Sequence, residues 1–206
     1  MYWHKTPWWL QWIYPGLEWH GSRDSKNLYL TFDDGPIPEE TPFILETLKR
    51  YNIKATFFCV GDNVRKHSSL FTQLVDAGHS IGNHTMHHVK GWGMDTDSYL
   101  EEVQACRQEI ARHGIDTTLF RPPYGKASRK QLRHLGDYRV IMWDVLSGDF
   151  DERLSPDICL KETKAATRNG SYILFHDNEK AHERLHFALP RFIESMVARG
   201  YEFKAL

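Results

Sequence analysis

The chain has 206 residues, of which 26 are Lys or Arg and 27 are Asp or Glu, so its formal net charge is -1 at pH 7. This balance gives no net positive charge to attract a nucleic acid, and a hydrophobic content of 41% is ordinary for one globular domain of this length. The sequence has no run of about 18 apolar residues, which excludes a predicted transmembrane helix.

The first 25 residues form an aromatic-rich segment ahead of a predicted domain at 26–206. Five of the seven tryptophans lie in the first twenty positions: Trp3, Trp8, Trp9, Trp12 and Trp19. We expect them to pack across the closed end of the fold that follows. Contact with a membrane and stacking on a sugar are the less favoured alternatives. The segment also lacks the apolar centre of a secretory signal, which favours a location in the cytoplasm or at the inner face of the membrane.

From Leu28 onward, strand-like runs alternate with amphipathic helical stretches, without a linker or an internal repeat. The predicted strands are 28–32, 55–60, 79–83, 118–121, 138–143, 171–175 and 201–204. The predicted helices are 39–51, 63–77, 96–113, 126–135, 156–168 and 182–199. Such alternation predicts an α/β fold with a parallel sheet in a single domain.

Polar residues follow the carboxyl ends of these strands, and their placement favours a barrel over an open sheet. They are Asp33, Asp34, His84, Arg121, Asp144 and His176. In a (β/α) barrel these ends share one mouth, whereas an open sheet would spread them along an edge. We therefore predict a distorted (β/α) barrel with about seven parallel strands.

Three cysteines, Cys59, Cys106 and Cys159, are widely spaced and odd in number. They lack the paired CxxC spacing of a thiolate zinc site, so buried reduced thiols are predicted.

Two adjacent carboxylates follow the first strand in TFDDGP at 31–36. Alone they could cap the next helix or form a turn, but neighbouring like charges are costly without a cation. His84 and His88 in GNHTMHH have the four-residue spacing of a zinc-type site and could hold that cation. The similar pair His182 and His186 has charged neighbours and no preceding carboxylate-bearing strand end, so it is predicted to be a solvated surface pair.

Two further motifs are weak individually. Arg121 in RPPYG could only brace a loop, and His176 in LFHD could be a satisfied core histidine. All four motifs lie at the ends of predicted strands, in this order along the chain. Chance is therefore a poor explanation for their occurrence together.

At this point the chain resembles the polysaccharide deacetylases, also called the NodB-homology domain or carbohydrate esterase family 4. The resemblance covers about residues 26–206, which would be the catalytic domain. It rests on TFDDGP (31–36), HTMHH (84–88), RPPY (121–124), WDVLSGDF (143–150) and LFH (174–176).

The resemblance implies one divalent metal ion bound by three side chains: Asp34, His84 and His88. Zinc is the default, and cobalt, nickel or iron could occupy such a site. It also implies that Asp33 is the general base and His176 the general acid.

Further positions carry supporting roles by the same resemblance. Arg121 would hold the base, and Asp149 would orient the acid. Tyr124 and Leu174 would shape the acetyl pocket, with the backbone N–H of Tyr124 as oxyanion donor.

The fourth motif departs from the family pattern, because many relatives carry an additional Asp and end in Trp where Leu146 and Phe150 stand here. Trp143 and Phe150 are assigned to the substrate pocket. The departure leaves Asp144 as an alternative to Asp149 for the carboxylate that orients the acid.

The expected activity is hydrolysis of N-acetyl groups from N-acetylglucosamine units of peptidoglycan or chitin-type oligosaccharides. A lipid-linked or nucleotide-linked amino sugar is an alternative substrate. Two other readings are a non-haem iron oxygenase, which shares the set of two histidines and one carboxylate, and a non-catalytic carbohydrate-binding module.

Overall fold

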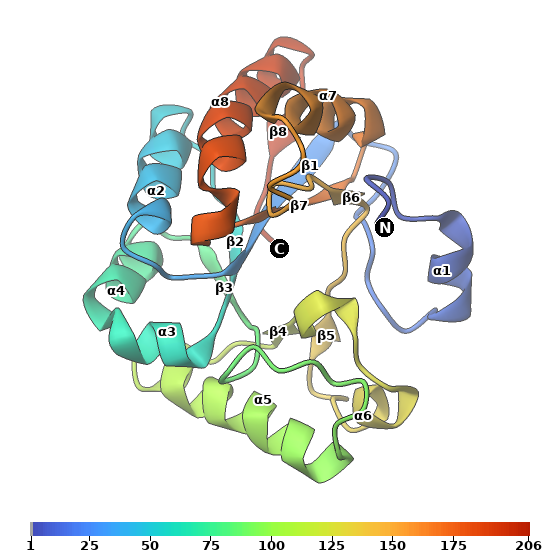
Figure 1. Cartoon of the computed structure of the whole chain (residues 1–206), viewed down its shortest axis with the longest axis vertical. Helices are drawn as coiled ribbons and strands as arrows, with labels where there is room; N and C mark the ends of the chain where they lie inside the picture. Colours follow the sequence, from blue (N-terminus) through green and yellow to red (C-terminus); the bar gives the residue numbers. More distant parts are fainter. Residues whose placement is uncertain (1) are drawn as a thin grey trace.

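Parallel strands curl into an incomplete barrel in the computed structural model, which describes residues 2–206 (Figure 1). The strands are β1 (Asn27–Asp34), β2 (Thr56–Cys59), β3 (Ser80–Asn83), β4 (Leu119–Phe120), β5 (Arg139–Val140), β6 (Val145–Leu146), β7 (Tyr172–His176) and β8 (Glu202–Phe203). Their order is β5-β4-β3-β2-β1-β7-β6, and β8 pairs with β1 outside this path. The predicted distorted barrel of seven parallel strands is confirmed.

Helices flank the curled sheet (Figure 1). They are α1 (Trp8–Ile13), α2 (Glu40–Arg50), α3 (Gly61–Lys66), α4 (Ser68–Asp76), α5 (Thr96–Ala111), α6 (Arg129–Arg133), α7 (Pro156–Ala166) and α8 (His182–Ala198), with 3-10 turns η1 (Pro123–Gly125) and η2 (Glu179–Ala181). Because helices cover the outside and side chains fill the inside, the central strands are buried on both faces. Phe32 of β1 stacks on Phe57 of β2 with ring centroids 4.9 Å apart.

Several predicted boundaries were wrong. The helix predicted at 63–77 breaks at His67, and the one at 126–135 shrinks to α6, which starts after a capping box formed by Ser128 and Gln131. The strand predicted at 138–143 ends at Val140, and β6 was missed, because these two-residue strands are too short to show alternation in sequence.

The aromatic N-terminal segment runs along the open seam of the barrel, between the edge strands β5 and β6 (Figure 1). On one side, Glu18 N–H donates to Val140 O at 2.9 Å, and on the other, Leu146 N–H donates to His4 O at 2.9 Å. The segment therefore supplies hydrogen bonds that the two sheet edges would otherwise lack.

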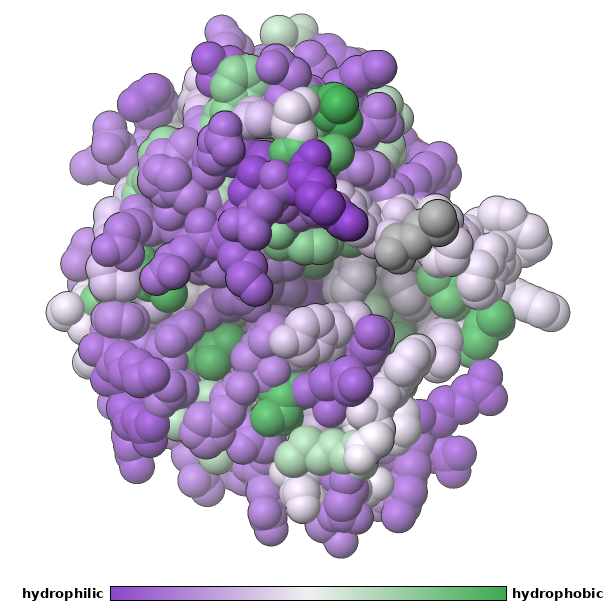
Figure 2. Space-filling model, in the orientation of Figure 1, coloured by the Kyte–Doolittle hydropathy of each residue, from purple (hydrophilic) through white to green (hydrophobic). Residues whose placement is uncertain are grey.

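The expectation that the tryptophans pack across the closed end is wrong. Trp19 is buried, whereas Trp3, Trp8, Trp9 and Trp12 are exposed. The segment around α1 forms the pale projection at the right of Figure 2, beside a surface that is mostly hydrophilic. The backbone of the segment meets the sheet, and most of its indole rings face outward.

The three cysteines are buried and free, as predicted. Among residues 2–206, no helix has the length and apolar character needed to cross a membrane.

Candidate active site

All but one of the predicted polar residues meet at the carboxyl ends of the strands, as expected for a barrel mouth. They border a cleft of about 780 Å³. Of the predicted site residues, the cleft is lined by Asp33, Asp34, His84, His88, Tyr124, Trp143, Phe150, Leu174 and His176. Arg121 and Asp149 are fully buried behind this lining.

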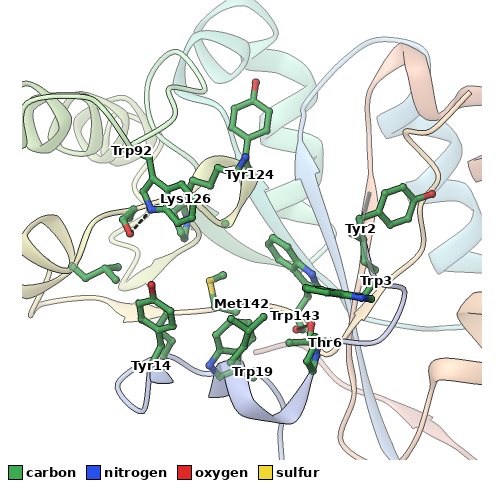
Figure 3. Close-up of a pocket in the computed structure, with 18 residues that line it drawn as sticks. Tyr2, Trp3, Thr6, Tyr14, Trp19, Trp92, Tyr124, Lys126, Met142 and Trp143 are labelled. Atoms are coloured by element: carbon green, nitrogen blue, oxygen red, sulfur yellow. Dashed lines mark hydrogen bonds between the residues drawn. The ribbon is translucent and has the colours of Figure 1, made fainter. Parts of the chain in front are cut away.

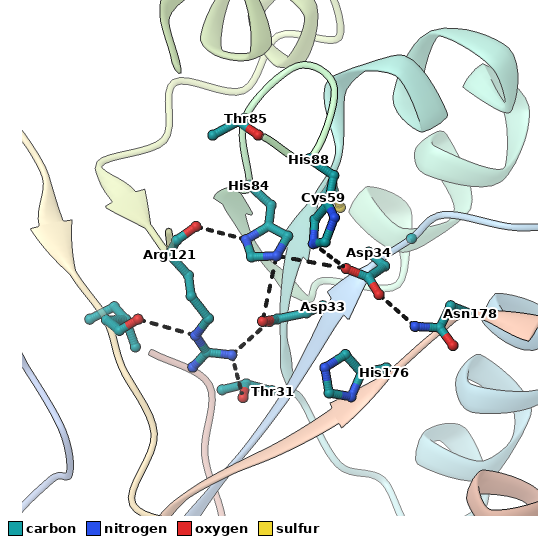
Figure 4. A network of polar contacts seen from close by, with 12 residues as sticks. Thr31, Asp33, Asp34, Cys59, His84, Thr85, His88, Arg121, His176 and Asn178 are labelled. Atoms are coloured by element: carbon teal, nitrogen blue, oxygen red, sulfur yellow. Dashed lines mark hydrogen bonds and ion pairs between the residues drawn. The ribbon is translucent and has the colours of Figure 1, made fainter. Parts of the chain in front are cut away.

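A buried ion pair supports the base of the site. Arg121 Nη1 donates to Asp33 Oδ1 at 2.7 Å and to Thr31 Oγ1 at 2.9 Å (Figure 4). Its Nε donates to the carbonyl of Ile141 at 3.1 Å, and its Nη2 donates to the carbonyl of Met142 at 2.8 Å. Burial lowers the pKa of Arg121 and the charge of Asp33 opposes that effect, so the guanidinium and the carboxylate depend on each other.

Three side chains converge as a metal-ligand group: Asp34, His84 and His88. Asp34 Oδ1 lies 3.1 Å from His88 Nε2 and 3.7 Å from His84 Nε2 (Figure 4). This oxygen is buried and makes no hydrogen bond within residues 2–206. A buried carboxylate oxygen without a donor, facing two imidazole nitrogens, fits a divalent cation of zinc type.

Neighbouring groups fix how these ligands point. His84 Nδ1 lies 2.7 Å from the carbonyl of Arg121, so Nδ1 carries the proton and Nε2 is left to face the cation position. Asn178 Nδ2 donates to Asp34 Oδ2 at 2.5 Å, and Asn63 Nδ2 donates to Asp34 O at 2.8 Å. Sequence reasoning missed both asparagines; the position of Asn178 two residues after His176 was the only available signal.

Unusual backbone conformations gather at this site. Asp34, Thr85, His88 and Tyr124 all have positive φ, at 92°, 65°, 54° and 60°. Such angles are costly for residues other than glycine and persist only where the surroundings enforce them. Their concentration around one cleft is typical of a functional site.

The turn after β1 is closed by Asp177, another residue that sequence reasoning missed. Its carboxylate accepts from Gly35 N–H and from the hydroxyl of Thr41, each at 2.9 Å. A Cβ at position 35 would lie 1.7 Å from Asp177 Oδ2, so only glycine fits there. Burial raises the pKa of Asp177 well above its usual range.

The ligand group has the protonation pattern that a cation requires. Burial alone would raise the pKa of Asp34, but the adjacent His88 and the fields of His176 and His84 hold it well below its usual range. Burial lowers the pKa of His84 to about 4, so the imidazole is neutral at pH 7. Metals bind carboxylates and neutral imidazoles, so no proton has to leave these two ligands at neutral pH.

His176 faces the same cleft from the end of β7 and is held by Asp149. Its Nδ1 lies 2.8 Å from Asp149 Oδ1, and its backbone N–H donates to Asp149 Oδ2 at 2.7 Å. Asp149 is in turn held through its carbonyl, which accepts from Arg184 Nε at 2.6 Å. Burial lowers the pKa of His176, but the charge and hydrogen bond of Asp149 outweigh burial and raise it to about 9.

Asp144 is the one strand-end residue that lies away from the mouth. Its side chain accepts from the Ser171 hydroxyl at 2.6 Å and pairs with Arg23 at 3.0 Å. Between the two carboxylates considered as partners of His176, the structure therefore places Asp149, and not Asp144, on the imidazole.

An aromatic groove of about 320 Å³ continues from the cleft, between the N-terminal segment and the loop that carries Tyr124 (Figure 3). The two cavities share Tyr2, Tyr124, Lys126, Trp143 and Leu146 in their linings. Trp92 lies in the groove, with its indole N–H bonded to Ala127 O at 3.0 Å.

His182 and His186, predicted to be a solvated surface pair, both contact a buried carboxylate that the sequence did not indicate. Glu40, at the start of α2, lies 2.7 Å from His182 Nδ1 and 2.9 Å from His186 Nε2. These contacts are ordinary hydrogen-bond distances that satisfy both oxygens of the buried carboxylate. This cluster needs no ion, in contrast to Asp34 and its unpaired oxygen.

Comparison with known proteins gives a consistent picture. A family model for polysaccharide deacetylase matches residues 20–141. The peptidoglycan-N-acetylglucosamine deacetylase PgdA of Listeria monocytogenes is 31% identical over 88% of this chain, which spans only 38% of that protein's length. The chitooligosaccharide deacetylase of Azorhizobium caulinodans is 32% identical over 76% of each chain. The crystal structure of the Bc1960 peptidoglycan N-acetylglucosamine deacetylase superposes with a TM-score of 0.90 at 30% identity, covering 98% of this chain and 95% of that one.

The buried ion pair can be tested by a double-mutant cycle. We expect Arg121→Met to lower the free energy of unfolding by about 3–5 kcal/mol, because it leaves a buried carboxylate unpaired. Adding Asp33→Asn should restore part of this loss, with a coupling of about 1–3 kcal/mol in urea unfolding. If the effects of the two substitutions on the free energy of unfolding simply add, the two side chains do not depend on each other.

The division between ligand and non-ligand carboxylates predicts different metal contents. After loading with zinc and dialysis, Asp34→Asn should lose bound metal, while Asp33→Asn should keep it, measured by inductively coupled plasma mass spectrometry. His182→Ala and His186→Ala serve as controls and should retain metal. Equal loss in the two Asp variants would contradict this assignment, as would loss in either control.

The pKa of His176 should depend on Asp149. In chelated protein, an NMR titration of the imidazole should give a pKa well above 6.5, and Asp149→Asn should lower it because the carboxylate field is removed. Because folding raises the pKa of His176, the stability that the His176–Asp149 pair contributes is fully present below about pH 6.5. It is lost as the pH rises through about 9. Asp157→Asn, on the exposed start of α7, is the matched control, and an unchanged pKa in Asp149→Asn would refute the pairing.

Proposed function

Because the chain belongs to the polysaccharide deacetylase family, we propose that it removes acetyl groups from N-acetylated amino sugars by hydrolysis. The observation that carries the proposal is that the ligand group around Asp34 and the His176–Asp149 pair face one cleft. N-acetylglucosamine units of peptidoglycan or of chitin-type oligosaccharides are the proposed substrates, since relatives acting on both are similar to this chain.

The proposed cofactor is one divalent cation held by Asp34, His84 and His88. Zinc suits this donor set best, and cobalt, nickel or iron would also fit. When bound, the cation would polarise the acetyl carbonyl and acidify a water molecule.

Asp33 is proposed as the general base. Arg121 fixes its Oδ1, while Oδ2 points toward His84 Nε2 at 3.7 Å, beside the ligand group. Asp33 would take a proton from the attacking water as the water oxygen bonds to the acetyl carbon. Tyr124, held at positive φ beside His88, would turn its backbone N–H toward the oxyanion that develops.

His176 is proposed as the general acid. The amine is a poor leaving group until its nitrogen is protonated, so the C–N bond breaks as His176 delivers a proton to that nitrogen. With its pKa raised to about 9, the imidazole is charged at pH 7 and ready to donate. The products are acetate and the free amino sugar.

The acetyl group itself would sit among apolar side chains. Leu174 and Trp143 line the cleft near the ligand group, and Phe150 packs edge-on against His176 with centroids 5.2 Å apart. This lining supports a small acyl group at the reacting position. A facial-triad oxygenase would need neither the Asp33–Arg121 pair nor the His176–Asp149 pair, so these pairs favour the hydrolase.

The direct test is acetate release from N-acetylglucosamine oligomers and from peptidoglycan by zinc-loaded protein. We expect His176→Ala to reduce kcat by about 10²–10⁴-fold, because general acid catalysis is lost while folding and metal content persist. His182→Ala is the matched control and should keep its activity. Near-normal turnover by His176→Ala would refute its role, and no acetate from either substrate with wild-type protein would refute the proposed function.

A further inference from the structure

The N-terminal segment presents an exposed aromatic face. This tryptophan face consists of Trp3, Trp8, Trp9, Trp12 and Ile13. Trp8 and Trp12 are 75% and 80% exposed, and no residue of α1 is buried. Exposed clusters of large apolar side chains on a soluble domain mark a surface that meets an apolar partner.

The geometry of the rings argues against a sugar platform. Trp3 and Trp9 meet edge to face, with centroids 6.2 Å apart and planes at 83°, so they offer no shared flat surface to a saccharide chain. Gln11 is the one side chain of α1 with a polar amide, and its neighbours are apolar. A polysaccharide would therefore find few hydrogen-bond partners on this face.

The charge around the tryptophan face is one-sided. Residues 2–17 contain Lys5 but no Asp or Glu. Residues 117–136 also contain no Asp or Glu, and the short helix α6 within them exposes Arg129, Lys130 and Arg133.

The basic side of α6 and the aromatic segment are adjacent. The Arg129 guanidinium lies over the Tyr14 ring, 5.5 Å from its centroid, and Leu132 of α6 lines the same groove as Leu10 of α1. Of the acids that end these two stretches, Glu18 is paired with Arg139 at 2.8 Å, and Asp137 lies four positions after Arg133. The surface thus combines exposed indoles with unneutralised cations.

We propose that this surface docks onto an anionic lipid bilayer. Indole rings favour the boundary between headgroups and acyl chains, where the ring is apolar and the N–H stays wet. The basic residues of α6 would meet the headgroup phosphates, and the attraction of cations to anionic lipid adds to burial of the indoles. Charge complementarity selects the bilayer over a second copy of the chain, whose equivalent face carries the same positive charge.

Docking in this way would orient the catalytic cleft. The aromatic groove runs from beneath α1 to the cleft and shares Tyr2, Tyr124 and Trp143 with it (Figure 3). The bilayer surface would therefore lie beside the groove entrance. This inference concerns binding and does not rest on the proposed function.

The test is sedimentation with sucrose-loaded vesicles of phosphatidylcholine, with and without phosphatidylglycerol. Wild-type protein should bind the anionic vesicles more tightly. Trp8→Ser with Trp12→Ser should weaken binding to both by about tenfold or more, because two exposed indoles no longer bury apolar surface. Arg129→Gln with Lys130→Gln and Arg133→Gln should weaken binding to the anionic vesicles by about a hundredfold, at about fivefold per charge.

Matched controls change the same kinds of residue elsewhere. Ile158→Ser with Val197→Ser removes exposed apolar side chains on α7 and α8, and Lys49→Gln with Arg50→Gln and Lys161→Gln removes exposed charges; both should bind as wild type. The proposal is overturned if wild-type protein binds neither vesicle, or if the controls lose as much binding as the test variants. It is also overturned if the Trp8 and Trp12 changes abolish only self-association in sedimentation velocity, or only retention on insoluble chitin or peptidoglycan.

Discussion

The buried ion pair between Arg121 and Asp33 is the constraint on which the site depends. A guanidinium with no exposure to solvent is tolerable only if its donors are satisfied, and four acceptors around the barrel do this. Two of them, Thr31 and Asp33, lie on β1, while the others lie just beyond β5 on the far side of the incomplete barrel. The pair thus links strands that share no backbone hydrogen bonds and closes the barrel interior beneath the cleft.

The same arginine also separates the roles of the two adjacent aspartates. It engages Asp33 from below, while the positive φ of Asp34 turns the second carboxylate toward His88. Its carbonyl accepts from His84 Nδ1 and so sets which nitrogen faces the cation position. Neighbouring carboxylates would otherwise repel each other, and here Arg121 pairs with Asp33 while His88 contacts Asp34. Asp149 and Arg184 provide the equivalent support for His176 on the opposite side of the cleft.

The residues at the strand ends could be predicted from sequence because the carboxyl ends of parallel strands converge, whatever the details of the loops. What could not be predicted depends on contacts across long separations. Arg184 reaches Asp149, and Glu40 reaches His182, between segments that no local pattern connects. The position of Asp144 was predicted wrongly for a related reason. It follows the predicted strand 138–143 and was expected at the carboxyl end of a strand, but it directly precedes β6, which the sequence did not indicate. Periodicity is absent from two-residue strands, so the register there is set by neighbouring strands alone.

The N-terminal segment answers two separate requirements. Its backbone bonds to the edges of β5 and β6 through residues such as His4 and Glu18, and any sequence able to stay extended could supply those bonds. Covering a sheet edge therefore does not explain why the outward positions carry tryptophan, when polar side chains would satisfy the same backbone and cost less in water. Trp8 and Trp12 are exposed and contribute nothing to the core, and no residue of α1 is buried. The aromatic composition must then serve something outside the fold, and its position over a groove that opens into the cleft ties that role to the site.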